Sequence, residues 1–162
     1  MNKKEDIYKL TSIILMLDQF IKIIIEKNMH LSQEITIIPN FFSIYYVRNT
    51  GAAFSILEDN TLFLIIISVI FIIVLDRFIK NEKNFTKLSI ISLGMIMGGI
   101  FGNLIDRIIN HAVIDYLSFS MLKYSFPIFN LADIGITLGV ALYILSMILE
   151  RKKTKCKTYS KN

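Results

Sequence analysis

The stretch GGIFGNLIDRIINHAVIDY, residues 98–116, is the strongest indication of the class of fold. It begins within a segment apolar enough to lie in lipid, and it then includes Asn103, Asp106, Arg107 and Asp115. Polar and charged side chains are costly inside a bilayer and mark a functional site there by default. The stretch therefore predicts a membrane helix that ends at a polar site.

Composition supports a membrane protein. The chain has 162 residues, 54% of them hydrophobic, with a mean hydropathy of +0.56, whereas soluble domains average about 45–50% apolar residues. Four apolar stretches approach the ~20 residues that a helix needs to cross the hydrocarbon. They are residues 7–25, 61–79, 88–105 and 128–149. We expect one all-α integral membrane domain, residues 1–162, with four transmembrane helices.

The distribution of positive charge predicts the orientation. Most of the 18 Lys and Arg residues lie at the N-terminus, between the second and third spans, and in the tail 150–162. Positive segments stay in the cytoplasm, so both termini are expected there and loops 26–60 and 106–127 face outward. The net charge of +5 then reflects topology, with the tail contacting anionic lipid and no nucleic acid.

The first outward loop is apolar in part. Its segment EITIIPNFFSIYYVRNTGAAFS, residues 34–55, is rich in β-branched and aromatic residues and partly alternates after Pro39. This pattern predicts short antiparallel strands. An apolar ribbon outside the membrane is expected to lie on the bilayer surface or to cover a site.

Glycines mark the helix contacts. Gly94, Gly98 and Gly102 recur every fourth residue in the third span, and Gly135 and Gly139 do so in the fourth. Small residues at this spacing let membrane helices approach closely. We interpret them as packing residues that turn the neighbouring polar side chains inward.

The polar residues of different spans are predicted to lie at one depth. The two outward-running spans carry them in their outer parts, the fourth span carries them in its first turns, and Asp115 belongs to the loop above. The set comprises Asp18, Lys22, Asn103, Asp106, Asn130 and Asp133. Their convergence near the outer leaflet predicts one site.

Other interpretations apply to some of these residues. Asp18, Lys22 and Glu26 have the spacing of an intrahelical ion-pair ladder. Asp106 and Arg107 are expected mainly to cap and anchor the third span at the interface. Functions other than hydrolysis also remain open, namely a proton-coupled transporter that uses membrane carboxylates as a relay, and a non-enzymatic assembly subunit.

Asp133 is the hardest residue to explain by packing. No Lys or Arg lies three or four positions away to neutralise it, and the nearest chemical match is Asp115. Two carboxyl groups in a partly dry site share a proton and titrate as a unit. Such a pair can activate water while its protonated member polarises a carbonyl, as in aspartic proteases. Asn103 and Asn130 are candidates to hold the acids or the substrate.

Five motifs together resemble the lipoprotein signal peptidases of type II. In chain order they are DQFIK (18–22), NTGAAFS (49–55), GGIFGNLIDR (98–107), VIDY (113–116) and FNLAD (129–133). The resemblance implies a four-helix bacterial aspartic endopeptidase without a metal or organic cofactor. Asn40, where a glycine is common, and Ile134, where a small residue is common, are departures that leave the two acids untouched.

The resemblance also implies roles for single residues. Asp115 and Asp133 match the catalytic pair. The matching supporting residues, which line the site or lie near the substrate or its lipid, are Asn103, Asp106, Arg107, Asn130, Asp18, Lys22, Asn49 and Gly51.

Such an enzyme cleaves the signal peptide of a prolipoprotein just before a cysteine that carries diacylglycerol. The implied partners are prolipoproteins and membrane lipids, with inhibition by globomycin-type cyclic peptides. The implied location is the bacterial plasma (inner) membrane, with the site at the outer leaflet. By the same resemblance, loop 35–55 forms a surface cradle over the substrate, and its aromatic residues suit an interfacial position. These are Phe41, Phe42, Tyr45 and Tyr46.

Overall fold

A computed structural model describes residues 2–51, 60–121 and 124–159, without the side chains of residues 121, 124–125 and 153–159. Residues 52–55 of the NTGAAFS motif and the basic side chains beyond Lys152 therefore lie outside the described part.

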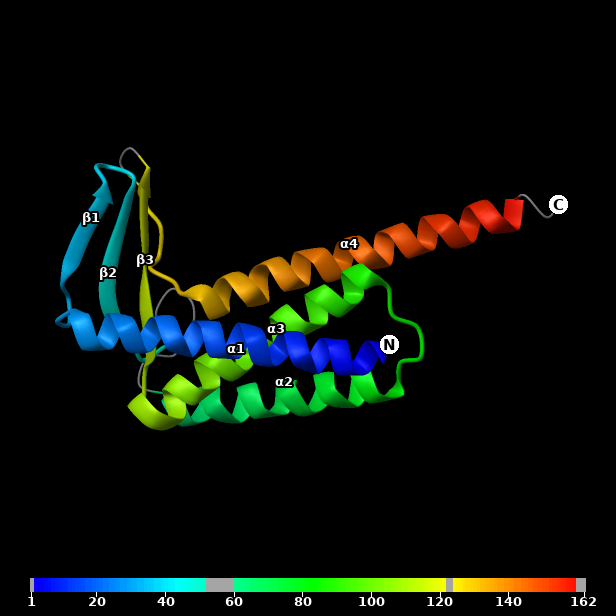
Figure 1. Cartoon of the computed structure of the whole chain (residues 1–162), viewed down its shortest axis with the longest axis horizontal. Helices are drawn as coiled ribbons and strands as arrows, with labels where there is room; N and C mark the ends of the chain where they lie inside the picture. Colours follow the sequence, from blue (N-terminus) through cyan, green and yellow to red (C-terminus); the bar gives the residue numbers. More distant parts are fainter. Residues whose placement is uncertain (1, 52–59, 122–123, 160–162) are drawn as a thin grey trace.

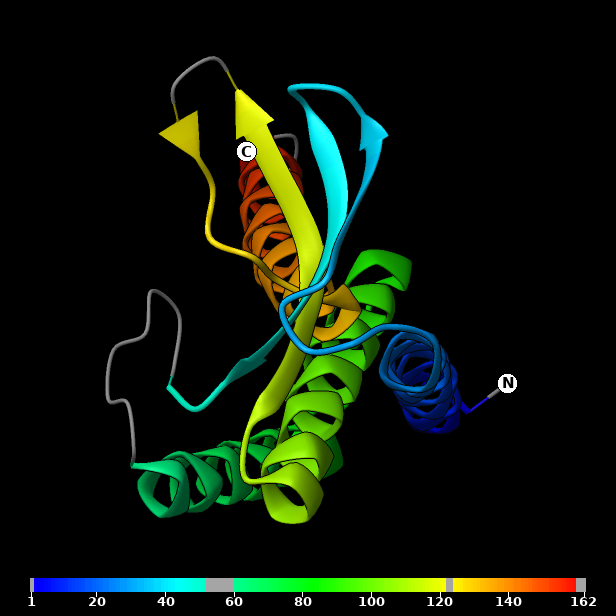
Figure 2. The ribbon, with the colours of Figure 1, turned by 90° about the vertical axis from the view of Figure 1, so that its left-hand side faces the viewer.

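The elements form a bundle of helices with strands across one end (Figures 1 and 2). The two chain termini lie at the other end of the bundle (Figure 1). In chain order the elements are α1 (Lys3–Asn28), β1 (Glu34–Ile38), β2 (Phe42–Asn49), α2 (Thr61–Asn81), α3 (Lys87–Asn110), β3 (Val113–Met121), β4 (Tyr124–Ser125) and α4 (Leu131–Tyr159).

Three described helices are long and apolar enough to cross a membrane, namely α2, α3 and residues 131–152 of α4. Helix α1 has 26 residues but is not among these three, so the crossing by residues 7–25 stays a prediction. The mostly helical fold with a small antiparallel sheet is confirmed.

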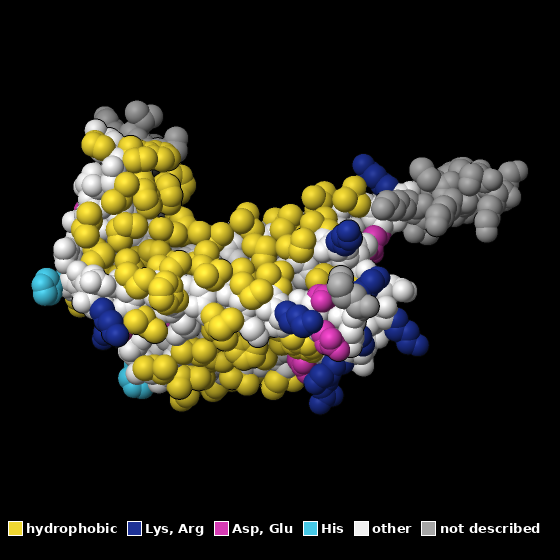
Figure 3. Space-filling view, viewed as in Figure 1, with side chains coloured by type: hydrophobic (Ala, Val, Ile, Leu, Met, Phe, Trp, Pro, Cys, Tyr) yellow, Lys and Arg dark blue, Asp and Glu magenta, His cyan; other side chains and the backbone are white. Residues whose placement is uncertain are grey.

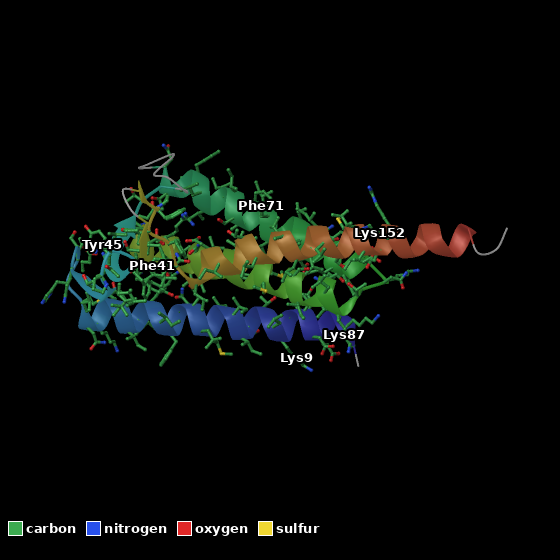
Figure 4. All side chains as sticks on the ribbon, turned by 90° about the horizontal axis from the view of Figure 1, so that it is seen from above. Lys9, Phe41, Tyr45, Phe71, Lys87 and Lys152 are labelled. Carbon is green, nitrogen blue, oxygen red and sulfur yellow. The ribbon has the colours of Figure 1, made fainter. Side chains whose placement is uncertain are left out.

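Apolar side chains cover the outside of the bundle. On α2, Leu62 is 71% exposed and Phe71 is 60% exposed, and Phe71 points away from the other helices (Figure 4). A broad hydrophobic band covers the face in Figure 3. Exposed apolar surface of this extent needs an apolar solvent, which the hydrocarbon of a bilayer supplies.

The bundle core is built around the predicted glycine contacts. A Cβ atom added at Gly94 would lie 2.8 Å from the Cβ of Leu10 on α1, and one added at Gly139 would lie 2.9 Å from the carbonyl oxygen of Ser92 on α3. Helices α1 and α4 therefore both pack closely on α3. This confirms the interpretation of the glycines as packing residues.

We expect Gly99→Ala to be destabilising and Gly135→Ala to be tolerated. A methyl group at Gly99 would overlap the carbonyl oxygen of Ala132 and lie 2.8 Å from Ile136, whereas at Gly135 the nearest atom is 3.1 Å away. Overpacking costs about 1–3 kcal/mol, while both variants gain helix propensity. Thermal unfolding in detergent should show a lower Tm for Gly99→Ala only, and equal Tm values for the two variants would contradict the packing.

The strands form an antiparallel sheet in the order β1-β2-β3-β4, so the strands predicted within residues 34–55 are confirmed for β1 and β2. Asn40, in the turn between them, has a φ of 58°, a conformation that Asn adopts more readily than most residues. This departure from glycine therefore leaves the hairpin intact.

Part of the second outward loop is also a strand. Residues 113–121 form β3 and pair with β2, with Val47 opposite Asp115. Sequence reasoning did not predict this strand, because its partner lies about 70 residues earlier in the chain. The pairing fixes Asp115 on a sheet rather than on an irregular loop.

The two ends of the bundle differ in chemistry. Lys9, Lys87 and Lys152 lie toward the end with the termini, while Phe41 and Tyr45 lie at the sheet end (Figure 4).

Buried hydrophobic clusters lie at both ends of the bundle. One contains Ile7, Ile79, Phe85, Leu93 and Met97, and the other, beneath the sheet, contains Met29, Tyr46, Ile114 and Tyr116.

Candidate active site

The site is built on the first turn of α4. Asn130 precedes this helix, and its Oδ1 accepts the backbone N–H of Asp133 (2.9 Å). In return, Asp133 Oδ2 accepts the backbone N–H of Asn130 (3.2 Å). These reciprocal bonds form a capping box. The backbone therefore holds Asp133 in place at the start of α4.

Two other elements complete this cap. The backbone N–H of Leu131 donates to the hydroxyl of Tyr116 on β3 (3.2 Å), and that of Ala132 donates to Asp18 Oδ1 on α1 (2.9 Å). Free N–H groups at a helix start need such acceptors when buried. The cap thus ties α4 to the strand that carries Asp115.

Asp115 is buried and held by two amides. Its Oδ1 accepts from Asn130 Nδ2 (2.6 Å), and its Oδ2 accepts from Asn49 Nδ2 (3.0 Å). Asp133 Oδ1 accepts from Asn103 Nδ2 (2.8 Å). Asn130 therefore contacts both acids, so the structure brings Asp115 and Asp133 into one hydrogen-bond network.

The two acids have different electrostatic environments. Burial raises the pKa of Asp115 to about 7, and the nearby charge of Asp133 adds to this, against the lowering effect of bonds from Asn49 and Asn130. Asp133 instead lies in the first turn of α4, where its carboxylate accepts from the side chain of Asn103 and the backbone N–H of Asn130. The pair is thus suited to hold one proton on Asp115 at neutral pH.

Both acids line a cavity of about 1150 Å³. Asn49, Asn103 and Arg107 line it as well. Much of the remaining wall is apolar and includes Phe119, Phe126, Phe129, Ile134, Ile136 and Leu138. A site that joins two acids to an apolar wall fits an amphipathic substrate with its reacting bond at the polar end.

A buried ion cluster lies behind the acids. Lys22 Nζ is 2.8 Å from Asp18 Oδ2 and 2.8 Å from Asp106 Oδ2, and the three side chains are at most 2% exposed. Asp106 also accepts the backbone N–H of Ile114 (3.1 Å). The interpretation of Asp106 as an interfacial anchor is therefore wrong, because its carboxylate faces the buried lysine.

The predicted ladder along α1 holds only in part. Asp18 and Lys22 are paired, but Glu26 binds Arg48 Nη2 on β2 at 2.6 Å. The Glu26–Arg48 pair is partly exposed. Hydrogen bonds from the Arg48 guanidinium to Tyr46 and Glu26 raise the pKa of Arg48. The ladder therefore ends at Lys22, where the ion cluster begins.

Arg107 and Gly51 join the third helix to the end of β2. Arg107 Nη2 donates to the carbonyl of Gly51 (3.0 Å), and the N–H of Gly51 donates to Asn49 Oδ1 (2.9 Å). Arg107 Nε is a buried nitrogen without a partner among the described residues. Arg107 and Asn49 thus lie at the cavity, whereas Asp18, Lys22 and Asp106 do not line it.

Sequence reasoning missed two supporting residues. Gln19 Nε2 donates to Asp106 Oδ1 (2.9 Å) and to the carbonyl of Gly102 (3.1 Å). Its polarity within an apolar span was a usable signal. Tyr116, which caps α4, gave no such signal, because an aromatic residue in an outward loop suggests only an interfacial position.

A comparison with protein families matches residues 10–149 to the model described as signal peptidase (SPase) II. The chain belongs to the signal peptidase II family. Membership indicates a membrane peptidase of the aspartic type, and the matched region contains all of the site residues described above.

Two solved structures agree with this assignment. Both are described as bacterial membrane enzymes determined by the in meso method, at 2.3 Å and 1.9 Å resolution. The first is 31% identical, with a TM-score of 0.82 over 89% of this chain and 88% of its own. The second is 33% identical, with a TM-score of 0.76 over 85% and 89%. The chain thus shares the fold of bacterial membrane enzymes along most of its length.

Proposed function

We propose that this signal peptidase II homologue cleaves diacylglyceryl-modified prolipoproteins before the lipidated cysteine, with Asp115 and Asp133 as the catalytic pair. The observation that carries the proposal is the network around Asn130, which bonds to both acids at the wall of an apolar cavity. Family membership supplies the reaction class.

The electrostatic difference between the acids supports a separate role for each. Ionised Asp133 removes a proton from a water molecule, whose oxygen attacks the carbonyl carbon of the scissile peptide bond. Protonated Asp115 donates to the carbonyl oxygen, and a proton then passes to the leaving nitrogen as the C–N bond breaks. The products are a signal peptide with a new carboxylate and a lipoprotein with a free α-amino group on its lipidated cysteine.

The lining of the cavity supports the proposed substrate. Its polar end has Asn103 and Arg107 beside the acids, and its apolar wall on α4 and β3 suits acyl chains and a hydrophobic signal peptide. Globomycin-type cyclic peptides, which are amphipathic, are expected to compete for the same space. The transporter alternative is disfavoured, because Asp18 and Asp106 are both paired with Lys22 in a closed cluster.

The chemistry of the bundle ends supports the proposed orientation. Most of the Lys and Arg side chains visible in Figure 3 lie toward the end opposite the sheet, where the lysines labelled in Figure 4 also lie, and positive ends stay in the cytoplasm. The sheet and the acids then lie at the outer face of a bacterial plasma membrane. There β1, exposed along its whole length, can rest on the lipid surface as the predicted cradle.

The test is cleavage of a diacylglyceryl-modified prolipoprotein peptide by the purified protein in detergent micelles. Mass spectrometry should find the lipidated product beginning at the modified cysteine. The same peptide without its lipid is the matched control and should be cleaved far more slowly, because it leaves the apolar wall unfilled. Cleavage at another bond, or no cleavage of the lipidated peptide, would contradict the proposal.

The pH dependence follows from the proton on Asp115. Its pKa of about 7 means that kcat/KM should fall as the pH rises above 7, because the protonated acid is lost. Asn49 donates to Asp115 and lowers its pKa, so Asn49→Ala should move this falling limb to higher pH. Profiles of kcat/KM between pH 5 and 9 would measure both effects, and an unchanged limb in Asn49→Ala would contradict the assignment.

A further inference from the structure

The side-chain amides of Asn103 and Asn130 each have a fixed direction. An Asn side chain donates from its nitrogen end and accepts at its oxygen end. Lys22 Nζ, which can only donate, lies 3.0 Å from Asn103 Oδ1. The backbone N–H of Asp133, also only a donor, binds Asn130 Oδ1. Both nitrogen ends are therefore turned toward the acids.

Lys22 is itself held from three sides. Its ammonium contacts Asp18 Oδ2, Asp106 Oδ2 and Asn103 Oδ1 at 2.8–3.0 Å, so each of its three N–H bonds has an acceptor. The residue as a whole is 1% exposed. Burying three charges is costly, and well-packed apolar residues often stabilise a fold as well as a buried ion cluster does. The cluster is thus better explained by placement of the ammonium than by stability.

We propose that Lys22 is a positioning residue whose ammonium sets the direction of the Asn103 amide, so that Asn103 donates to Asp133. This inference rests on the proposed catalytic role of Asp133. Lys22 does not line the cavity, so it acts through Asn103 and not on the substrate. Without it, Asn103 Oδ1 keeps its bond from Asn130 Nδ2 (3.1 Å) but loses the donor that anchors it to α1.

The main test replaces the lysine without changing the charge of the cluster. Lys22→Met alone leaves Asp18 and Asp106 as two buried, unpaired carboxylates, so it is combined with Asp106→Asn. The double variant has the same net charge in the cluster as the wild type, but Asn103 Oδ1 no longer has the lysine donor from α1. We expect kcat to fall about 10- to 100-fold, because small displacements of aligned groups cost that much, with little change in KM. Unchanged kcat in a folded double variant would overturn the proposal.

A double-mutant cycle shows whether Lys22 acts through Asn103. In the Asp106→Asn background, Lys22→Met should lower kcat when residue 103 is Asn and have little further effect when it is Ala. Asn49→Ala is the matched control, because Asn49 donates to Asp115 Oδ2 and does not contact Lys22. When Lys22→Met is combined with Asn49→Ala, the separate effects of the two changes on kcat should multiply. Losses that multiply with Asn103→Ala as well would overturn the proposal.

A second variant tests the orientation of the Asn103 amide without altering Lys22. Asn103→Asp keeps an acceptor for Lys22 but places an oxygen where the nitrogen faces Asp133, so its kcat should lie below that of Asn103→Ala. An equal or higher kcat would overturn the proposal even if the Lys22 variants do not fold. Failure of the proposed function is distinguishable, because Asp133→Asn would then keep normal turnover.

Discussion

Cleavage of a diacylglyceryl-modified prolipoprotein peptide will fall by about 10³- to 10⁴-fold in Asp115→Asn and in Asp133→Asn. Each change removes a carboxyl group that general acid–base chemistry needs, and such groups typically contribute about 10²–10⁴-fold. The rate of peptide release, measured by mass spectrometry at neutral pH, is the readout. Near-normal turnover in either variant would remove that residue from the proposed pair.

The matched control is an aspartate at the other end of the bundle. Asp76 pairs with Lys80 at 2.7 Å and accepts the hydroxyl of Tyr8 at 2.7 Å, far from the sheet end. Asp76→Asn should keep turnover within about twofold of the wild type, since it touches neither the cavity nor its supports. Size-exclusion profiles and Tm values of all three variants separate a loss of chemistry from a loss of fold.

Asp18→Leu will cause the largest loss of stability, about 3–5 kcal/mol. It removes one partner of the buried Lys22 and the acceptor for the backbone N–H of Ala132 at the start of α4. Because that turn carries Asn130 and Asp133, peptide cleavage should be lost as well. Thermal unfolding and the cleavage assay measure the two effects on one preparation.

Two controls separate charge from hydrogen bonding. Asp18→Asn keeps an acceptor for Ala132 and leaves Asp106 to balance Lys22, so its Tm should lie between those of the wild type and Asp18→Leu. Glu26→Gln weakens the partly exposed pair with Arg48 on the same helix, where ion pairs contribute about 0–1 kcal/mol. If Glu26→Gln were as destabilising as Asp18→Leu, the special role of the buried cluster would be contradicted.

Several parts of the site were predictable because their signals are local. An acid such as Asp133, without a cation one turn away, is detectable in a linear sequence because helix geometry determines which residues are its neighbours. The packing role of the glycines of α3 and α4 was predictable for the same reason. The FNLAD motif also places Asn130 three residues before Asp133, which is the spacing of a capping box.

The supports of the site were not predictable, because they depend on which elements meet. Asp106 reads as the polar end of a membrane helix, yet it is 2% exposed and faces Lys22 from another helix. Glu26 has the spacing to continue a ladder on α1, but β2 presents Arg48 to it instead. In both cases the competing partner lies at least 20 residues away, so only packing decides between them.

The sequence by itself determined the membrane class, the helical segments and the hairpin after α1, and it predicted Asp115 and Asp133 as the candidate pair, since each is encoded in composition, periodicity or a short motif. Only the tertiary structure decided that β3 pairs with β2 and carries Asp115 to the start of α4. It also decided that Asp18 on α1 caps that helix and that Lys22 on α1 donates to Asn103 Oδ1 on α3. The physical reason is that buried polar groups must find partners, and the partner nearest in space need not be near in the chain.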